Sequence, residues 1–328
     1  MRSGVPVGNA YLANRVAIDI SRHMPLRVRP KRPTRHPSHD ADMGCSTISD
    51  ALEIRHVRTH DEFVQCVELE AATWGAGFRE SVPATILKIT QRLGGVTAGA
   101  FAPDGALVGF VFGITGVERG ELVHWSDMLA VAAGAQNHGI GRRLKEFQRD
   151  AVGTLGVTRM YWTYDPLVSR NAHFNLNLLG ARVVEYVRDM YGADTGSTLH
   201  QGLGSDRFIV VWPITPEPES ASRATPPAEA WQSSPIINGT PAGGTPADLA
   251  VRDDAAPSLA RVEIPSDILA VQQRRIAEAV AWRESTRSSL QWALTNGYRI
   301  AGFQRDSSSD RNFYLLARDP AAAAFAPT

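Results

Sequence analysis

A short segment with two glycines is the part of the sequence best suited to chemistry; it reads Gln-Asn-His-Gly-Ile-Gly-Arg-Arg-Leu over residues 136–144. Two glycines two positions apart let the backbone turn tightly, so that successive N–H groups converge on one point. The helix predicted after them aims free N–H groups and the positive end of its dipole at that point. Arg142 and Arg143 add positive charge. The segment is therefore predicted to be a phosphate cradle, with a pyrophosphate group as its natural ligand.

The elements on either side of this segment suit that role. An apolar, strand-like run over residues 121–131 leads into the glycines. After them, Ile140, Leu144, Phe147 and Ala151 recur at steps of four and three, which predicts an amphipathic helix. A Rossmann-type dinucleotide loop is disfavoured, because the spacing lacks a third glycine and no strand ending in an acidic residue follows about 20 residues later.

The rest of residues 51–214 alternates between short strands and helices. Pro103, Asp104 and Gly105 lie between two apolar runs and predict a hairpin turn. The predicted order is strand, two helices, three strands, cradle and helix, strand, helix and two antiparallel strands. The strands are expected at 52–57, 96–101, 107–114, 121–131, 159–164, 183–190 and 207–212, and the other helices at 59–73, 86–93 and 172–179.

The regions outside that domain differ in composition. Residues 1–50 are basic and rich in proline, and we expect either a disordered leader or a segment that precedes a true start at Met43. Residues 215–258 mix proline with small residues and show no apolar period, which predicts a flexible linker. Residues 259–320 read strand, helix, strand and strand, like the end of the first domain. They predict a small docked α+β module, an internal half-domain repeat, before a tail at 321–328.

The composition disfavours several kinds of partner. The formal net charge is zero, so the whole-chain charge favours neither nucleic acid nor an anionic membrane. Only Cys45 and Cys66 occur, without metal-like spacing, so we expect no disulfide, no metal site and a cytoplasmic location. No apolar run approaches the ~20 residues that span a bilayer. We therefore expect a soluble protein without a nucleic-acid or membrane partner.

The order of elements and the glycine segment resemble the GNAT superfamily of N-acetyltransferases over about residues 52–214. The family signature is Gln/Arg-x-x-Gly-x-Gly/Ala after the fourth strand, which Gln136, Gly139 and Gly141 match. The resemblance implies an α/β (α+β) fold with a mixed, mainly antiparallel central sheet flanked by helices. Residues 162–167 and 169–172 resemble, more narrowly, a branch of uncharacterised predicted acetyltransferases that carry a C-terminal extension. The module at 259–320 then resembles half of a GNAT domain.

The resemblance also implies which residues hold the cofactor, acetyl-CoA or another acyl-CoA. In the family, the loop N–H groups bind the pyrophosphate, and the pantetheine arm lies where the fourth and fifth strands separate. For the arm this implies Met128, Leu129, Ala130 and Val131, and for the phosphates Gln136, Asn137, His138, Gly139, Ile140, Gly141 and Arg142. Asn171 and Phe174 either contact CoA or cap and pack their helix.

Acyl transfer to an amine needs a proton acceptor for the ammonium, N–H donors for the oxyanion and a proton for the departing thiolate. The resemblance points to His124 and Asp127, on the fourth strand, as candidate bases. A bulge would change which of them faces the cleft, so strand alternation does not decide between them. The position at which the family often has a tyrosine acid is Leu176 here, which leaves the proton donor open between Tyr164, Tyr191 and water.

These residues predict an N-acyltransferase, most simply an N-acetyltransferase, that moves an acyl group from CoA to an amine of a small molecule such as an amino acid by direct attack. One alternative is transfer of a succinyl or longer acyl group, with Arg79, Arg170 or Arg188 meeting the extra carboxylate. Another is a domain that binds acyl-CoA as a sensor or an interaction module, which Leu176 in place of a tyrosine favours. A homodimer also stays open.

Overall fold

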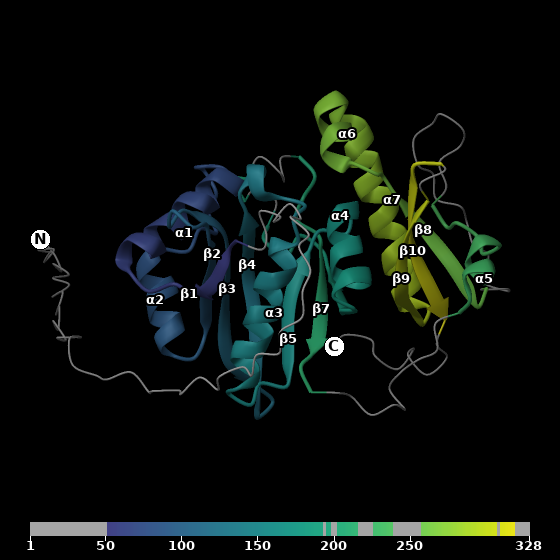
Figure 1. Cartoon of the computed structure of the whole chain (residues 1–328). Coiled ribbons are helices and arrows are strands. Elements are labelled where there is room, and N and C mark those ends of the chain that lie inside the picture. Colours follow the sequence, from purple (N-terminus) through teal and green to yellow (C-terminus); the bar gives the residue numbers. More distant parts are fainter. Residues whose placement is uncertain are drawn as a thin grey trace, which may run out of the picture. The chain divides into compact units, whose positions relative to one another are not determined.

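The computed structural model describes residues 51–192, 195–197, 202–215, 226–238, 257–306 and 309–318. The predicted leader and the tail at 321–328 lie outside these residues. Seven strands form one sheet in the order β1-β2-β3-β4-β5-β7-β6, with β4 and β5 as its parallel pair (Figure 1). The predicted mixed, mainly antiparallel α/β fold is confirmed. The strands are β1 (Glu53–His56), β2 (Val96–Phe101), β3 (Leu107–Glu118), β4 (Glu121–Val131), β5 (Arg159–Tyr164), β6 (Arg182–Val187) and β7 (Arg207–Pro213).

Helices cover both faces of this sheet. Successive side chains of a strand point to opposite faces, and on β3 Phe110 packs with α1 and α2 while Val111 packs with α3. On α3, Ile140 and Leu144 are buried, as the apolar period predicted. The helices are α1 (His60–Trp74), α2 (Ala84–Arg92), α3 (Ile140–Gly153) and α4 (Ser169–Ala172), which continues as a π-helical segment, His173–Leu178.

The start of α1 is set by its local sequence. Thr59 accepts a hydrogen bond from the Glu62 N–H, and the Glu62 carboxylate accepts one from the Thr59 N–H, which together form a capping box. Such a cap contributes about 1 kcal/mol to helix stability. Thr59 is therefore the N-cap residue of α1.

The hairpin between β3 and β4 is longer than predicted. The ladder continues to the pair Glu118 and Glu121, whereas the sequence predicted an end near residue 114. Arg119 and Gly120 both have positive φ, 51° and 84°, which is the geometry of a two-residue turn that matches strand twist. Such a tight turn lets backbone pairing extend past the last buried apolar residue.

The C-terminal module repeats the topology of the last three strands of the main sheet. Its order is β8-β10-β9, with a helix between the first two strands of the sequence, just as β5-β7-β6 has a helix between β5 and β6. All neighbours are antiparallel in both sets. The half-domain repeat stays a prediction, which this shared topology supports. The elements are β8 (Leu259–Ile264), α6 (Ile268–Arg274), α7 (Ile276–Thr295), β9 (Tyr298–Asp306) and β10 (Arg311–Arg318).

The module and the main sheet share one apolar core. Phe208 of β7 lies 5.3 Å from Tyr314 of β10, ring centre to ring centre, and both side chains are fully buried. The Tyr314 hydroxyl donates to the Pro166 carbonyl over 2.7 Å. A three-stranded sheet with one helical layer is too small to bury its own apolar face, which gives a physical reason for this contact.

Part of the predicted linker is structured. Within residues 226–238 lies a short helix, α5 (Ala228–Gln232), and Trp231 and Ile237 are buried there. The Ile237 N–H also donates a backbone hydrogen bond of 2.8 Å to the Arg261 carbonyl of β8. The two large apolar side chains are the reason that this stretch packs; the proline-rich remainder at 216–225 and 239–256 lies outside the described residues.

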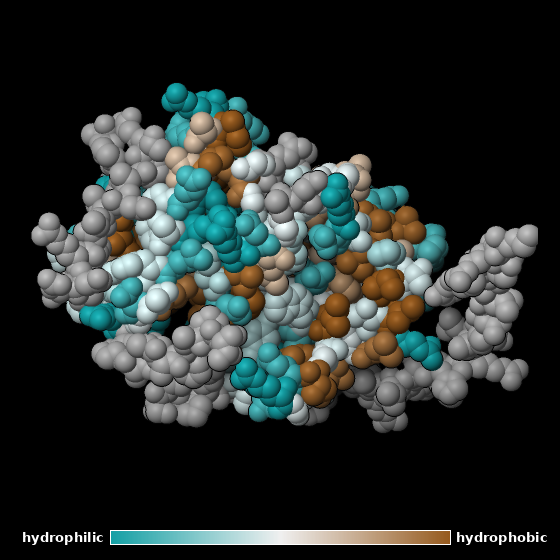
Figure 2. Space-filling model, turned by 180° about the vertical axis from the view of Figure 1, so that it is seen from behind, coloured by the Kyte–Doolittle hydropathy of each residue, from teal (hydrophilic) through white to brown (hydrophobic). Residues whose placement is uncertain are grey.

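None of the described helices is both long and apolar enough to cross a membrane. Large apolar side chains that are exposed include Ile86 and Ile89 of α2 and Leu93, the residue that follows this helix. Seen from behind, hydrophobic side chains lie in several groups between hydrophilic ones (Figure 2).

Candidate active site

The glycine segment forms the turn between β4 and α3. Asn137 and Gly139 have φ values of 66° and 75°, a left-handed conformation that reverses the chain direction. The Gln136 side chain donates to the Val131 carbonyl over 3.0 Å and ties the turn to the end of β4. No side chain caps α3, and its first turn carries no acidic residue. The positive end of the helix is therefore open to an anion.

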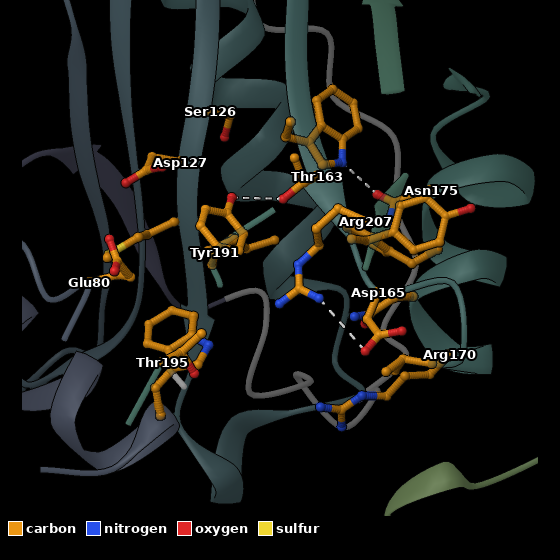
Figure 3. Close-up of a pocket in the computed structure, with 18 of the residues that line it drawn as sticks. Glu80, Ser126, Asp127, Thr163, Asp165, Arg170, Asn175, Tyr191, Thr195 and Arg207 are labelled. Atoms are coloured by element: carbon orange, nitrogen blue, oxygen red, sulfur yellow. Dashed lines mark hydrogen bonds and ion pairs between the residues drawn. The ribbon is translucent and has the colours of Figure 1, made fainter. Parts of the chain in front are cut away.

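The parallel strands β4 and β5 diverge in front of this turn. They pair at three positions, the last of which joins Trp125 to Tyr161. Beyond that pair β5 leaves β4, while β4 stays paired with β3 as far as Val131. The divergence, which we call the fork, opens a cleft of about 310 Å³. Ser126 and Asp127 of β4, Thr163 of β5 and Asp165, the residue after β5, line it (Figure 3).

Several residues predicted to bind the cofactor surround the fork. Met128, Leu129, Asn171 and Phe174 line the cleft, and Ala130 and Val131 continue β4 towards the cradle. A side chain at Gly141 would lie 3.7 Å from Leu129 and 3.8 Å from Phe174. The start of α3, the end of β4 and the π-helical segment therefore converge. The His138 ring lies 3.4 Å from the Ala135 carbonyl.

Asp127 occupies a bulge of β4. Phe112 pairs with Met128 and the next residue of β3, Gly113, pairs with Ser126, so Asp127 is the extra residue. Part of its side chain is exposed to solvent, but the cleft walls surround the carboxyl group. The resulting loss of hydration raises the pKa of this carboxyl. A hydrogen bond with Trp125 opposes the rise and the charge of Glu80 adds to it. A carboxylate with a raised pKa in a cleft is suited to accept a proton.

The far side of the cleft is built from segments distant in sequence. The Tyr191 hydroxyl lies 3.1 Å from the Thr163 hydroxyl of β5, and the Arg207 guanidinium lies over the Tyr191 ring. The carbonyl of Thr195 accepts the Arg79 N–H over 3.0 Å, so the segment between β6 and β7 contacts the loop between α1 and α2. From the C-terminal module, α6 adds Ile268 and Leu269 to the lining.

The other two predicted catalytic residues are buried. The His124 ring shares one hydrogen bond of 2.9 Å with the Thr115 hydroxyl, and His124 does not line the cleft. Burial lowers the pKa of His124 to about 3, with a further small effect of the nearby Lys145. Tyr164 does line the cleft, but its hydroxyl is fully buried and its neighbour is the equally buried Tyr314. Burial raises the pKa of Tyr164, so this phenol keeps its proton at neutral pH.

Asp165 caps the turn that follows β5, because its carboxylate accepts a hydrogen bond from the Leu167 N–H over 2.8 Å. It also forms an ion pair with Arg283 of α7 at 2.6 Å and lies 3.7 Å from Arg207. Burial alone would raise the pKa of Asp165, but the two guanidinium groups outweigh it and lower the pKa. This carboxylate therefore joins the module to the main domain.

Lys145 is a cleft residue that the sequence did not reveal. It belongs to α3, is 2% exposed and donates to the Ser126 hydroxyl over 2.7 Å. The sequence predicted Phe147 and Ala151 on the buried face of α3, but both side chains are only half-buried. The fully buried positions are Ile140, Leu144, Lys145, Gln148 and Val152. A buried face predicted along residues 144, 148 and 152 would have included Lys145.

No family model and no curated protein matches this chain. Solved structures do match: the NatC complex bound to Gag peptide and CoA over 50% of this chain and 99% of that one, at 18% identity and a TM-score of 0.40. An aminoglycoside 6'-N-acetyltransferase complexed with coenzyme A matches over 51% and 99%, at 17% identity and 0.39. The ribosomal-protein-S18-alanine N-acetyltransferase from Escherichia coli matches over 51% and 97%, at 18% identity and 0.40.

Similarity at this level has no bearing on reaction or substrate. The class of protein follows from the chain's own topology: seven strands with one parallel pair, a fork at that pair and a glycine turn into α3. This is the architecture that the resemblance to the GNAT superfamily implied.

Proposed function

We propose that the protein is an acyl-CoA-dependent N-acyltransferase, most simply an N-acetyltransferase, whose acceptor is an amine of a small molecule. The observation that carries the proposal is the position of the fork directly beside the open N-terminus of α3, with one continuous stretch, residues 126–139, joining them. A ligand with a pyrophosphate at one end and a reactive thioester on a long arm matches this arrangement.

In this proposal the phosphates lie against residues 136–142, and the arm follows the edge of β4 that β5 leaves open at Met128–Val131. Arg142 and Arg143 add positive charge at the phosphate end. Asn171 and Phe174 contact the arm from the opposite wall of the cleft.

The proposed reaction is direct attack of the amine nitrogen on the thioester carbonyl carbon. The ammonium form of the acceptor first loses a proton, which Asp127 accepts. A C–N bond then forms and the C–S bond breaks, and N–H groups of β4 stabilise the oxyanion between these steps. The CoA thiolate takes a proton from Tyr191, Tyr164 or water, the attacking nitrogen gives up its second proton and so restores that donor, and Asp127 returns the first proton to solvent. His124, behind β4, remains a weaker candidate for the base than Asp127, because it does not line the cleft.

Release of free thiol from acyl-CoA tests this function. Purified protein is mixed with acetyl-CoA or succinyl-CoA and a panel of amines, amino acids included, and thiol is followed against a reaction without protein. Turnover with at least one amine supports the proposal. Tight CoA binding with no turnover for any amine would instead favour the sensor, the alternative that Leu176 suggests.

Gly139→Glu tests the cradle directly, because it introduces a negative charge at the point where the phosphates would lie. We expect CoA affinity to fall by about 100-fold or more. Gly105→Glu is the matched control: Gly105 also has positive φ, 88° against 75°, and a side chain at either position would meet no neighbour within 4 Å. CoA affinity that persists in Gly139→Glu would show that the cradle is wrongly assigned.

We extend the proposal to a cytoplasmic location, since the described part of the chain has one cysteine, Cys66, which is buried and free. Light scattering on the purified protein would distinguish a monomer from the homodimer that the sequence left open.

A further inference from the structure

The base of the fork is filled by a lysine side chain. Ser126 and Trp162 are the first residues of β4 and β5 beyond the last backbone pair. Lys145 reaches between them from α3: its Nζ lies 2.7 Å from the Ser126 hydroxyl and 3.9 Å from the centre of the Trp162 ring. The three residues line the same cleft. An amine is therefore placed where the two strands begin to separate.

This amine lacks a counterion among the described residues. No carboxylate forms an ion pair with it, and burial is the cause that lowers its pKa well below the usual value. The groups that face it are the Ser126 hydroxyl, the Trp162 ring and, nearby on the same side of β4, His124, which is neutral at pH 7. Burial of an amine with one hydrogen bond is costly, and such groups cluster at functional sites.

The composition makes this position less ordinary still. The chain has three lysines, Lys31, Lys88 and Lys145, among 34 basic residues. Lysine's role as a general solubilising surface residue is thus taken by arginine in this protein, while one of the few lysines is buried in the cleft.

The proposed function determines which part of a ligand would reach Lys145. The cradle lies at the C-terminal end of β4, so an arm that leaves it along Val131–Met128 runs towards Ser126. The thioester would then lie at the fork, and the acyl tail would point at its base. A plain acetyl methyl would bury an apolar group against an amine. A tail that ends in a carboxylate would give the amine the counterion that it lacks.

We propose that Lys145 selects an acyl group with a terminal carboxylate, such as succinyl, and pairs with that carboxylate at the base of the fork. This inference rests on the proposed function and names the acyl donor of the same site. Of the arginines that the sequence suggested for such a carboxylate, Arg170 lines the cleft, but it contacts Gln136 of the cradle, at 3.5 Å. Arg188 pairs with Asp189, and Arg79 is exposed.

The test compares two donors that have the same chain length. Succinyl-CoA and butyryl-CoA both carry four-carbon acyl groups and differ in the terminal carboxylate. By isothermal titration calorimetry we expect the wild-type protein to bind succinyl-CoA about tenfold tighter than butyryl-CoA. In Lys145→Met, which keeps the length of the side chain, this ratio should fall to about one or below. Lys88→Met, at an exposed position of α2, should keep the ratio of the wild type.

Proton uptake gives a second readout that does not depend on a variant. A neutral Lys145 must gain a proton to pair with the carboxylate, so succinyl-CoA binding at pH 8 should take up about one proton while butyryl-CoA binding takes up none. Titrations in buffers of different ionisation enthalpy measure this number.

Equal affinity for the two donors in the wild type, or an unchanged ratio in Lys145→Met, would overturn the inference and leave the proposed function intact. Free CoA is titrated into each protein as a reference ligand. If the wild-type protein does not bind free CoA, the proposed function is overturned and this inference with it.

Discussion

Two places in the molecule bury basic side chains, and the surroundings of these side chains differ. At the joint between the main sheet and the C-terminal module, Arg283 pairs with Asp165 at 2.6 Å and Arg287 pairs with Asp206 at 2.6 Å. At the fork, Lys145 has a hydroxyl and an aromatic ring as neighbours, and no carboxylate among the described residues.

The difference distinguishes a structural role for the paired arginines from a binding role for the unpaired lysine. A buried ion pair with its hydrogen bonds satisfied is a means to hold two units in one orientation, although it adds little net stability. A buried amine without a counterion is a cost to the folded state unless a ligand completes it. We therefore assign the joint to architecture and the fork to binding, and the following variants test that assignment.

The largest effect is expected at the joint. Arg283→Met leaves Asp165 buried with only the more distant Arg207, and the free energy of unfolding should fall by about 3 kcal/mol. Urea denaturation measures it. Arg274→Met is the matched control, because Arg274 forms an exposed ion pair with Glu278 and its loss should cost less than about 0.5 kcal/mol. Equal losses in the two variants would contradict a structural role for the joint.

In the cleft, Asp127→Asn should act on rate and spare the fold. The variant removes the proposed base, so kcat should fall by about 100-fold, which corresponds to about 2.7 kcal/mol in the barrier. Because burial raises the pKa of this carboxyl in the folded state, its removal should not lower the free energy of unfolding. A kcat within threefold of the wild type would exclude Asp127 as the base.

The pH dependence of stability tests whether Lys145 is neutral without ligand. Its pKa is lowered in the folded state, so just below the usual lysine pKa of about 10.4 the unfolded chain binds a proton that the folded chain does not. Stability therefore rises with pH in that window. Relative to Lys145→Met, the free energy of unfolding of the wild type should increase with pH between pH 8 and 10, by at most about 1.4 kcal/mol per pH unit. A difference that does not change with pH would mean that Lys145 is charged.

The smallest effect is expected where the module lines the cleft. Leu269→Ala removes apolar contact surface from the acceptor end and should raise the KM for the amine about threefold. The affinity for CoA, bound at the other end, provides the comparison. An unchanged KM would limit the module to its structural joint.

Much of the fold was predictable because its signals are local. The apolar periods placed β4 and α3 correctly, the turn residues at 103–105 marked a hairpin, and Thr59 capped α1. The cradle was predictable for the same reason, since a left-handed Gly139 and the helix after it lie within a few residues of each other. The sequence missed α6 and α5, which are short and gain their stability from burial of Ile268 and Trp231 in contacts with distant strands.

In the candidate site, too, the part set by neighbours in the chain was predictable and the part set by distant contacts was not. The sequence by itself determined the glycine turn that forms the proposed phosphate end, because conformation and charge there depend on neighbours in the chain. Tertiary structure alone decided the reacting end. A bulge aims Asp127, a fork exposes Ser126 and Trp162, and α3 brings Lys145 between them. These residues come from three elements, and the depth at which each lies sets its charge, because burial rather than residue type determines whether an isolated amine or carboxyl is ionised.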